Sequence, residues 1–411
     1  MQKAGDWVVI GIIGGGASGM AAALAAAENP QAQVLLFERQ ARLGKKLQVT
    51  GNGRCNLTNL HASNGGYHGE DAAFSNFALN AFGPEDTLRW FRSMGLFTVA
   101  EESGRVYPYS DQANSVVDVL RFALEKSNIR VLTGFEVTKL RRSESGFLVE
   151  NGEESYFCDK LIVACGGLAG TKAGGSMAGY KLLGKLGHHS TRLRPALVQL
   201  KCGWGGVAAL KGVRANCKAA IIHDGAVHAQ SIGELQFTEY GLSGPVIFEV
   251  SRDACHQRGN WTCRLDFLPD TDREVLLSEL LRRQQTELTV EELLTGVLHN
   301  RLGRVLTKAA GISGSGKIAD LPREALNAVC EAVKNFEIPL TEPMGMDHAQ
   351  VTAGGMITDE FNADTMESKL VPGLYACGEV LDIDGDCGGY NLQWAWSSGR
   401  LAGLSAGKEI T

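Results

Sequence analysis

The chain has 411 residues, more than a single hydrophobic core usually supports, so two or three domains are expected. Its net charge of -6 offers no broad attraction to nucleic-acid phosphates or to anionic lipid, and disfavours both as partners. The ten cysteines include no C-x-x-C pair and the nine histidines show no ligand spacing. We therefore expect reduced thiols and no metal site.

Near the N-terminus an apolar run turns through glycines into an alanine-rich segment. Gly14, Gly16 and Gly19 satisfy the pattern G-x-G-x-x-G, in which glycine permits a tight turn, approach of a pyrophosphate and close helix–strand packing. Residues 34–37 are typical of a second strand, which ends in Glu38, where a carboxylate accepts hydrogen bonds from ribose hydroxyls. Strand, turn, helix, strand and acid together predict a bound dinucleotide.

The same stretch allows a second interpretation, because residues 7–27 carry no charge and are long enough to span a bilayer. Its five glycines argue against this, since each weakens a helix by about 1 kcal/mol relative to alanine. A signal peptide is not indicated either, because no basic segment, apolar segment and cleavage site can be separated ahead of the glycines. We expect a cytoplasmic protein without a membrane partner.

Further glycine-rich segments follow apolar strands. The polar loop 51–59 suits phosphate and ring-edge hydrogen bonds, with an ordinary turn as the alternative. The run 161–165 predicts a parallel strand buried on both faces, and the run 373–377 predicts another strand that ends in Gly378-Glu379. A last glycine loop leads into a predicted helix at 391–400, whose N-terminus can stabilise negative charge.

The pattern changes in the middle of the chain. Short alternating segments, among them 246–250, predict an inserted β domain, and Asp224-Gly225 is typical of a hairpin turn. Capping boxes at Thr271/Glu274 and Thr289/Glu292 begin a helical stretch. The expected division is a discontinuous nucleotide-binding domain of residues 1–190 and 341–411, a β domain of 191–270 and a helical domain of 271–340.

Several of these motifs coincide with one known family. The motifs are T-G-N-G-R-C-N at 50–56, F-T-E-Y-G-L-S-G-P at 237–245 and C-G-G-Y-N-L-Q-W at 387–394. With the first glycine motif they cover most of the chain, which resembles the BaiN-like bacterial NAD(P)/FAD-dependent oxidoreductases. Cys387 departs from the threonine expected there. The resemblance implies an α/β fold with a Rossmann-like discontinuous FAD-binding domain, an inserted β-barrel-like domain and a small helical domain.

The glycine motif and the resemblance together give a set of expected FAD contacts. By the resemblance, the loop 51–56 lines the isoalloxazine and phosphates, Val137 contacts the adenine, and the helix start near residue 391 lies by the flavin pyrimidine edge. The expected contacts are Gly14, Gly16, Ala17, Ser18, Gly19, Glu38, Arg39, Lys46, Gly51, Asn52, Gly53, Arg54, Cys55, Asn56, Val137, Ala164, Cys165, Gly166, Gly378, Glu379, Asn391, Leu392 and Gln393.

Flavin chemistry requires no protein nucleophile, so the catalytic candidates are groups that orient substrate or donate protons. Their places in the glycine loops make Arg54, Tyr390, Tyr107 and Cys387 candidates, of which Arg54 and Tyr390 are preferred. The alternatives are packing of a turn for Tyr107, support of the helix start for Tyr390 and packing for Cys387. The segment 174–179 has the glycines of a second nucleotide motif without the preceding strand, so NAD(P)H, the expected donor, would dock over the flavin or against the inserted domain.

The predicted function is transfer of hydride through FAD to a small unsaturated organic substrate. Two alternatives are an oxidase that passes electrons from a small amine or alcohol to oxygen, and a non-catalytic or nucleic-acid-associated flavoprotein. The sequence alone does not name the substrate or the oligomeric state.

Overall fold

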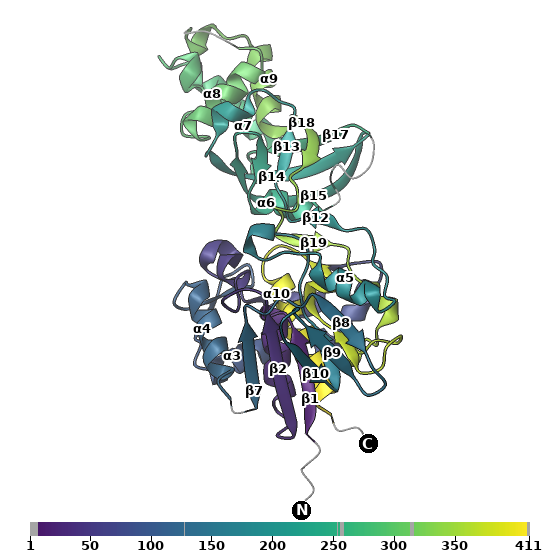
Figure 1. Cartoon of the computed structure of the whole chain (residues 1–411). Coiled ribbons are helices and arrows are strands. Elements are labelled where there is room, and N and C mark those ends of the chain that lie inside the picture. The colour runs from purple at the N-terminus through teal and green to yellow at the C-terminus, as the bar shows by residue number, and fades with distance from the viewer. Residues whose placement is uncertain (1–6, 127, 253, 255–258, 313–315, 409–411) are drawn as a thin grey trace, which may run out of the picture. The chain divides into compact units, whose positions relative to one another are not determined.

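The computed structural model of the chain describes residues 7–126, 128–252, 254, 259–312 and 316–408 (Figure 1). The chain divides into two compact units. Unit 1 comprises Met1–Arg194 and Gln350–Thr411, and unit 2 comprises Pro195–Ala349. Each unit has its own hydrophobic core. Unit 1 is therefore discontinuous. Its first segment ends at residue 194 and its second begins at residue 350, whereas the sequence suggested boundaries at 190 and 341.

Unit 1 is built on a parallel five-stranded sheet with the order β20-β11-β1-β2-β7. All four residues of β11 are buried, as the uninterrupted apolar run predicted. This sheet and the helices confirm a Rossmann-like α/β fold. Its strands are β1 (Val8–Ile13), β2 (Ala32–Glu38), β7 (Ile129–Thr133), β11 (Lys160–Val163) and β20 (Leu374–Ala376).

Helices α1 (Ala17–Ala26) and α10 (Tyr390–Gly407) pack together closely in unit 1. Glycines at four-residue spacing on α10 allow this approach, because a Cβ atom at Gly399 would lie 2.3 Å from the Ser18 carbonyl oxygen, and one at Gly403 would lie 2.3 Å from that of Ala22. The Lys160 ammonium donates to the carbonyl oxygens of Ala406 and Lys408 at the end of α10. Residues from both chain ends thus form one layer.

The remaining elements of unit 1 are short. Three of them form an antiparallel sheet with the order β10-β9-β8, whose first strand along the chain begins at Lys139. The elements are α2 (Asn76–Ala81), α3 (Pro84–Ser93), α4 (Ala113–Ala123), α5 (Ala178–Lys185), β3 (Thr58–Asn59), β4 (Tyr67–His68), β5 (Thr98–Ala100), β6 (Arg105–Pro108), β8 (Lys139–Arg142), β9 (Phe147–Glu150), β10 (Ser155–Cys158), β19 (Val351–Ala353) and β21 (Asp384–Gly385), with β12 (Arg194–Ala196) at the unit boundary.

Unit 2 contains the predicted β-barrel, which is closed in the order β13-β16-β15-β14-β17-β18. Asp224 and Gly225 both have positive φ, 46° and 86°, and form the predicted hairpin turn between β14 and β15. The strands are β13 (Leu200–Cys202), β14 (Arg214–His223), β15 (Ala226–Phe237), β16 (Gly241–Ser243), β17 (Trp261–Asp266) and β18 (Phe336–Pro343).

The segment 246–250, expected to be a strand, is the helix α6 (Pro245–Val250). Pro245 occupies the first helical turn, where its missing N–H costs nothing, and the preceding Gly244 has a φ of 98°. The spacing of the buried Val246, Ile247 and Val250 fits a helical face as well as a strand. The Gly244-Pro245 pair therefore favours the helix over the strand.

The α-helices that follow α6 in unit 2 are α7 (Arg273–Arg283), α8 (Asn300–Ala309) and α9 (Arg323–Lys334). They share one hydrophobic core with the barrel, so the segment 271–340 lies inside unit 2 and is not a compact unit of its own. The Thr289/Glu292 capping box is present, whereas α7 begins after Asp272, so the box predicted at Thr271 does not form.

Candidate functional site

The glycines after β1 differ in what surrounds them. Gly14 has a φ of 110°, and a Cβ atom there would lie 2.4 Å from the Ala164 carbonyl oxygen. A Cβ atom at Gly19 would lie 1.8 Å from the carbonyl oxygen of Gly14. At Gly16, by contrast, no heavy atom lies within 4 Å of the added carbon. Gly14 and Gly19 are therefore needed for packing, and Gly16 leaves open space at the N-terminus of α1.

The Glu38 carboxylate closes this turn from the end of β2. It accepts hydrogen bonds of 2.7 Å from the backbone N–H groups of Gly15 and Gln40. The backbone carbonyl of Glu38 accepts from the Phe135 N–H at 2.9 Å, which brings the segment that contains the buried Val137 beside the acid. Val137 and Glu38, expected at the adenosine end of the cofactor, are thus neighbours in the fold.

Two further predicted residues form an ion pair. The Lys46 ammonium lies 2.8 Å from a carboxylate oxygen of Glu379, whose other oxygen accepts from the Thr352 N–H at 2.9 Å. Arg39, next to Glu38, donates to the Gly174 carbonyl oxygen at 2.8 Å. The predicted residues at the two chain ends are therefore brought to the same edge of the sheet.

The ends of β11 and β20 form the next part of this edge. Gly378 has a φ of 76°, and its turn is held by α10, since its N–H donates to the Ser398 hydroxyl and its carbonyl accepts from the Trp394 indole N–H. At Gly166, after β11, an added Cβ atom would meet nothing within 4 Å. Burial raises the pKa of the neighbouring Cys165 thiol to about 12, so this thiol stays neutral.

The loop that carries T-G-N-G-R-C-N begins in a 3-10 segment, Leu47–Gly53. Gly51, Asn52, Gly53 and Cys55 all have positive φ, so the backbone turns sharply there. Burial raises the pKa of the Cys55 thiol to about 12, against the effect of the Thr50 hydroxyl, which makes Cys55 a packing residue. The Asn56 side-chain oxygen is buried and has no hydrogen-bond partner among the described residues.

Arg54, one of the two catalytic candidates, is held in place by its neighbours. Its guanidinium donates to the Asp111 carboxylate, lies 3.5 Å from Glu101 and stacks 3.9 Å from the centre of the Tyr107 ring. The hydrogen bond to Asp111 raises the pKa of Arg54, so the group carries its charge throughout the accessible range. Burial raises the pKa of the Tyr107 phenol as well.

Tyr390, the second candidate, belongs to a cluster that the sequence did not reveal. The Tyr67 hydroxyl donates to the Tyr390 carbonyl oxygen at 3.1 Å, and the two rings meet edge to face at 5.9 Å. The adjacent His68 imidazole lies 2.7 Å from a carboxylate oxygen of Asp386. The short pairing of β4 with β21 creates this contact across 318 residues, and no periodicity in the sequence indicates it.

The predicted residues at the start of α10 use their side chains within the protein. The Gln393 amide is fully buried and bonds to Thr58, Thr87, Ser397 and the Phe82 carbonyl oxygen. The Asn391 amide bonds to both backbone groups of Gly385. Any contact of this helix start with a ligand would therefore come from first-turn backbone N–H groups, which lack intrahelical acceptors.

The residues at this edge fit FAD. Gly16 opens onto the first turn of α1, whose backbone N–H groups can bind a diphosphate and which contains no acidic residue of its own. The unpartnered Asn56 oxygen needs a hydrogen-bond donor. Within the described ranges, no group of three or more metal-ligating side chains comes together, and no helix is long and apolar enough to cross a membrane.

Comparison with known proteins decides the family. Residues 8–405 match the family described as HI0933-like protein Rossmann domain. The chain belongs to the HI0933-like family. This match confirms the family resemblance carried by the sequence motifs. Together with the dinucleotide fold of unit 1, membership of the HI0933-like family identifies the chain as an FAD-dependent oxidoreductase.

Two relatives of this HI0933-like chain match it over nearly their whole length. It is 40% identical over 407 residues to a 3-dehydro-bile acid delta(4,6)-reductase of Clostridium scindens, covering 97% of this chain and 98% of the relative. It is 32% identical over 394 residues to a ribosomal RNA dihydrouridine synthase of Escherichia coli, covering 94% and 95%. Among solved structures, the 3-ketosteroid delta1-dehydrogenase of Sterolibacterium denitrificans matches with a TM-score of 0.49, 12% identity and coverage of 97% and 99%.

Proposed function

We propose that the protein uses NAD(P)H to reduce a carbon–carbon double bond conjugated to a carbonyl group. The names of its two relatives support this proposal. A 3-oxo steroid with double bonds at positions 4 and 6 and a uracil ring both contain such a bond. One relative is named as a reductase of the delta(4,6) compound, and the other is named for dihydrouridine, in which the bond of the uracil ring is saturated. Reduction of each double bond consumes one hydride and one proton, so one NAD(P)H and one proton balance it.

Bound FAD would carry the hydride chemistry, and the protein would hold it in place. We assign the diphosphate to the backbone N–H groups at Gly16, Ala17 and Ser18, and the ribose to Glu38. The Lys46–Glu379 ion pair would fix the turn after β20 beside it. The same assignment gives the α10 N-terminus the role of stabilising negative charge at the isoalloxazine.

The proton needs a donor near the reacting carbon, and the cluster around Tyr390 offers one. His68 is the histidine that pairs with the loop leading into α10, through its 2.7 Å contact with Asp386. Both side chains are partly exposed, so a proton removed from His68 can be replaced from solvent. We assign His68 as the proton donor, Asp386 as its positioning partner, and Tyr390 and Arg54 as substrate-orienting groups.

The test is anaerobic mixing of the FAD-loaded protein with NADH and, separately, with NADPH. We expect one of them to bleach the visible flavin absorbance rapidly, and a conjugated enone or dienone to restore it. Bleaching only by an amine or alcohol, with peroxide on re-aeration, would instead establish the oxidase alternative. Absence of bleaching by every donor would overturn the proposal.

A further inference from the structure

The charges of this acidic chain are segregated along its sequence. Residues 160–223 contain ten of the forty Lys and Arg residues and none of the forty-six Asp and Glu residues. The rest of the chain therefore has thirty basic against forty-six acidic residues. The net charge of -6 is a sum over the whole chain, so it does not give the sign of the charge on the part of the surface that residues 160–223 form.

The two units differ in whether these basic residues form ion pairs. In unit 2, acids from outside the segment pair with three of them: Lys201 with Glu342 and Lys211 with Glu239, each at 2.7 Å, and Arg214 with Glu234 at 3.3 Å. In unit 1, four residues are exposed, and none forms an ion pair with a residue that the structure describes. We call these four the basic face: Lys172, Lys181, Lys185 and Arg192.

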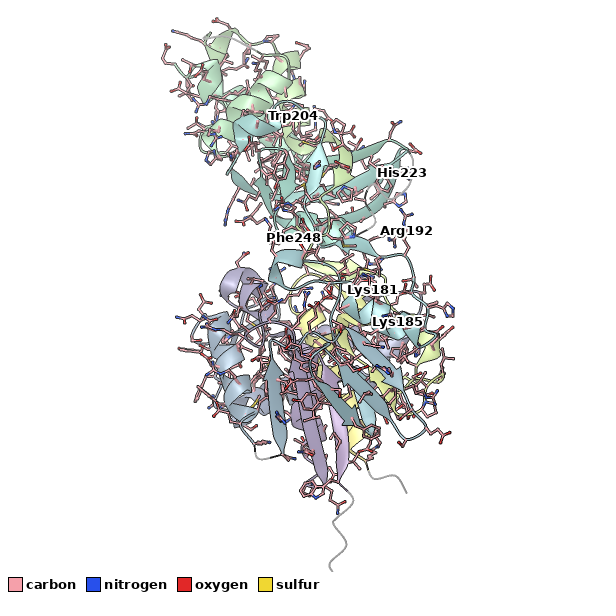
Figure 2. All side chains as sticks on the ribbon, viewed as in Figure 1. Lys181, Lys185, Arg192, Trp204, His223 and Phe248 are labelled. Carbon is pink, nitrogen blue, oxygen red and sulfur yellow. The ribbon has the colours of Figure 1, made fainter. Side chains whose placement is uncertain are left out.

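The basic face is arranged around α5. Lys181 and Lys185 are one helical turn apart and lie on the same side of the helix. Figure 2 labels both on α5, together with Arg192 from the segment that follows the helix. Lys172 precedes α5 in the chain and Arg192 follows it, so the four charges come from α5 and from the segments on either side of it.

The opposite side of α5 packs against the proposed cofactor edge. The Tyr180 hydroxyl donates to the Glu379 carbonyl oxygen at 3.4 Å. A Cβ atom at Gly179 would lie 2.8 Å from that of Cys165 and 3.0 Å from the Val380 side chain. A molecule held on the basic face would therefore lie one helix diameter from the turns to which we assign FAD.

We propose that the basic face binds the backbone phosphates of an RNA whose uracil is the reduced group. Four exposed cations on and beside one helix, none of them in an ion pair with a described residue, match a chain of phosphates better than they match one small anion. RNA is favoured over other polyanions because two relatives, 32% and 27% identical, are named ribosomal RNA dihydrouridine synthases. The inference rests on the proposed function, because uracil contains the conjugated double bond assigned above.

The test measures binding of a short, uridine-rich, single-stranded RNA to the FAD-loaded protein as a function of salt. With four phosphate contacts, the slope of log affinity against log salt is about -2.8, and affinity falls roughly 50-fold between about 50 and 200 mM salt. The variant K172Q/K181Q/K185Q/R192Q should lose most of this slope. The matched control K201Q/K211Q removes paired charges from the same segment and should keep it.

FAD content and reduction by NAD(P)H are measured on the same samples and should not change in the fourfold variant. A wild-type protein that does not bind the RNA, or a fourfold variant that binds it as tightly, would overturn the inference. Equal affinity for heparin, or a changed KM for NADPH with unchanged RNA binding, would overturn it too. A protein that reduces a steroid dienone but fails to bind RNA would refute this inference and leave the proposed function standing.

Discussion

Lys46 and Glu379 are 333 residues apart in sequence, and their side chains form an ion pair of 2.8 Å. Both are largely shielded from solvent, with 30% and 18% of their side chains exposed. Lys46 follows the second strand of the N-terminal βαβ unit, and Glu379 follows the last strand of the sheet. The pair therefore links the two chain segments that together make unit 1.

Breaking this pair should reduce the stability of the apoprotein. The substitutions Lys46→Met and Glu379→Gln, combined in a double-mutant cycle, should give a coupling energy of about 1 kcal/mol, because the pair is partly screened by solvent. Urea unfolding of the two single variants, the double variant and the wild type provides the measurement. A coupling energy indistinguishable from zero would mean that the contact contributes nothing to joining the segments.

Gly16→Val should abolish FAD binding while leaving the fold intact. Gly16 has an extended backbone conformation that valine also adopts, and its side-chain direction is open. The added methyl groups would occupy the space that we assign to the diphosphate. Purified G16V should be colourless, with an unfolding midpoint equal to that of wild-type apoprotein. Retention of stoichiometric FAD would refute the assignment.

Gly19→Val is the matched comparison, since it places the same side chain one helical turn further along. There the added carbon meets the Gly14 carbonyl at 1.8 Å, which the backbone cannot accommodate. G19V should therefore lose stability in the absence of FAD as well as in its presence. Equal behaviour of G16V and G19V would contradict the separate roles given to the two glycines.

The nucleotide-binding half of the fold was predictable because its determinants are local. Gly14, Gly16, Gly19 and Glu38 lie within one βαβ unit, where spacing along the chain fixes spacing in the structure. The helix α6 was mistaken for a strand because a segment of five residues, four of them apolar, is too short to show a period. In that case Gly244-Pro245 carried the decisive signal.

The contacts between distant segments could not be predicted. Nothing in the sequence indicates that His68 contacts Asp386. His68 ends one two-residue strand and Asp386 follows another, and neither strand has an apolar pattern. Gln393 was expected beside the cofactor, yet its amide satisfies four groups of the core. Partners separated by hundreds of residues depend on tertiary packing, which a single sequence does not specify.

Gln393→Leu should destabilise unit 1. The substitution keeps the volume but leaves the buried groups around Gln393, among them the hydroxyls of Thr58 and Thr87, without their partner. Each such group costs about 1–3 kcal/mol, so a loss of several kcal/mol in the free energy of unfolding is expected. Urea titration of the apoprotein measures it. The exposed Gln112→Leu is the control, and an equally small effect of both would disprove the role of the network.

His68→Asn should slow reduction of the acceptor without slowing reduction of the flavin. Loss of a positioned acid typically costs a factor of about 10²–10⁴ in the step that uses its proton. Stopped-flow measurement of the two half-reactions separates these steps, and Asp386→Asn should show the same selectivity with a smaller loss. His299→Asn, in unit 2, should leave both rates unchanged. Equal slowing of both half-reactions would assign His68 a structural role instead.

Stability should decrease as the pH falls below neutrality, and His188 should be responsible. Burial lowers the pKa of His188 from its ordinary value of 6.5, although hydrogen bonding to Glu360 opposes this. The unfolded chain therefore binds a proton at His188 at a higher pH than the folded protein does, so acidification favours unfolding. The Glu360 carboxylate, whose pKa is raised by burial but lowered overall by its hydrogen bonds to His189 and His188, loses its contribution only in a more acidic window.

The measurement compares Tm at about pH 7.5 and about pH 5.5 for the wild type and for His188→Gln. The imidazole is stacked on Phe361 at 4.5 Å and bonded to Ser368 at 3.0 Å, so glutamine should lower Tm at both values. The difference in Tm between the two pH values should nevertheless shrink, because glutamine does not titrate. His189→Gln, at an exposed position that also contacts Glu360, should retain most of that difference. An unchanged pH dependence in His188→Gln would place the acid sensitivity elsewhere in the chain.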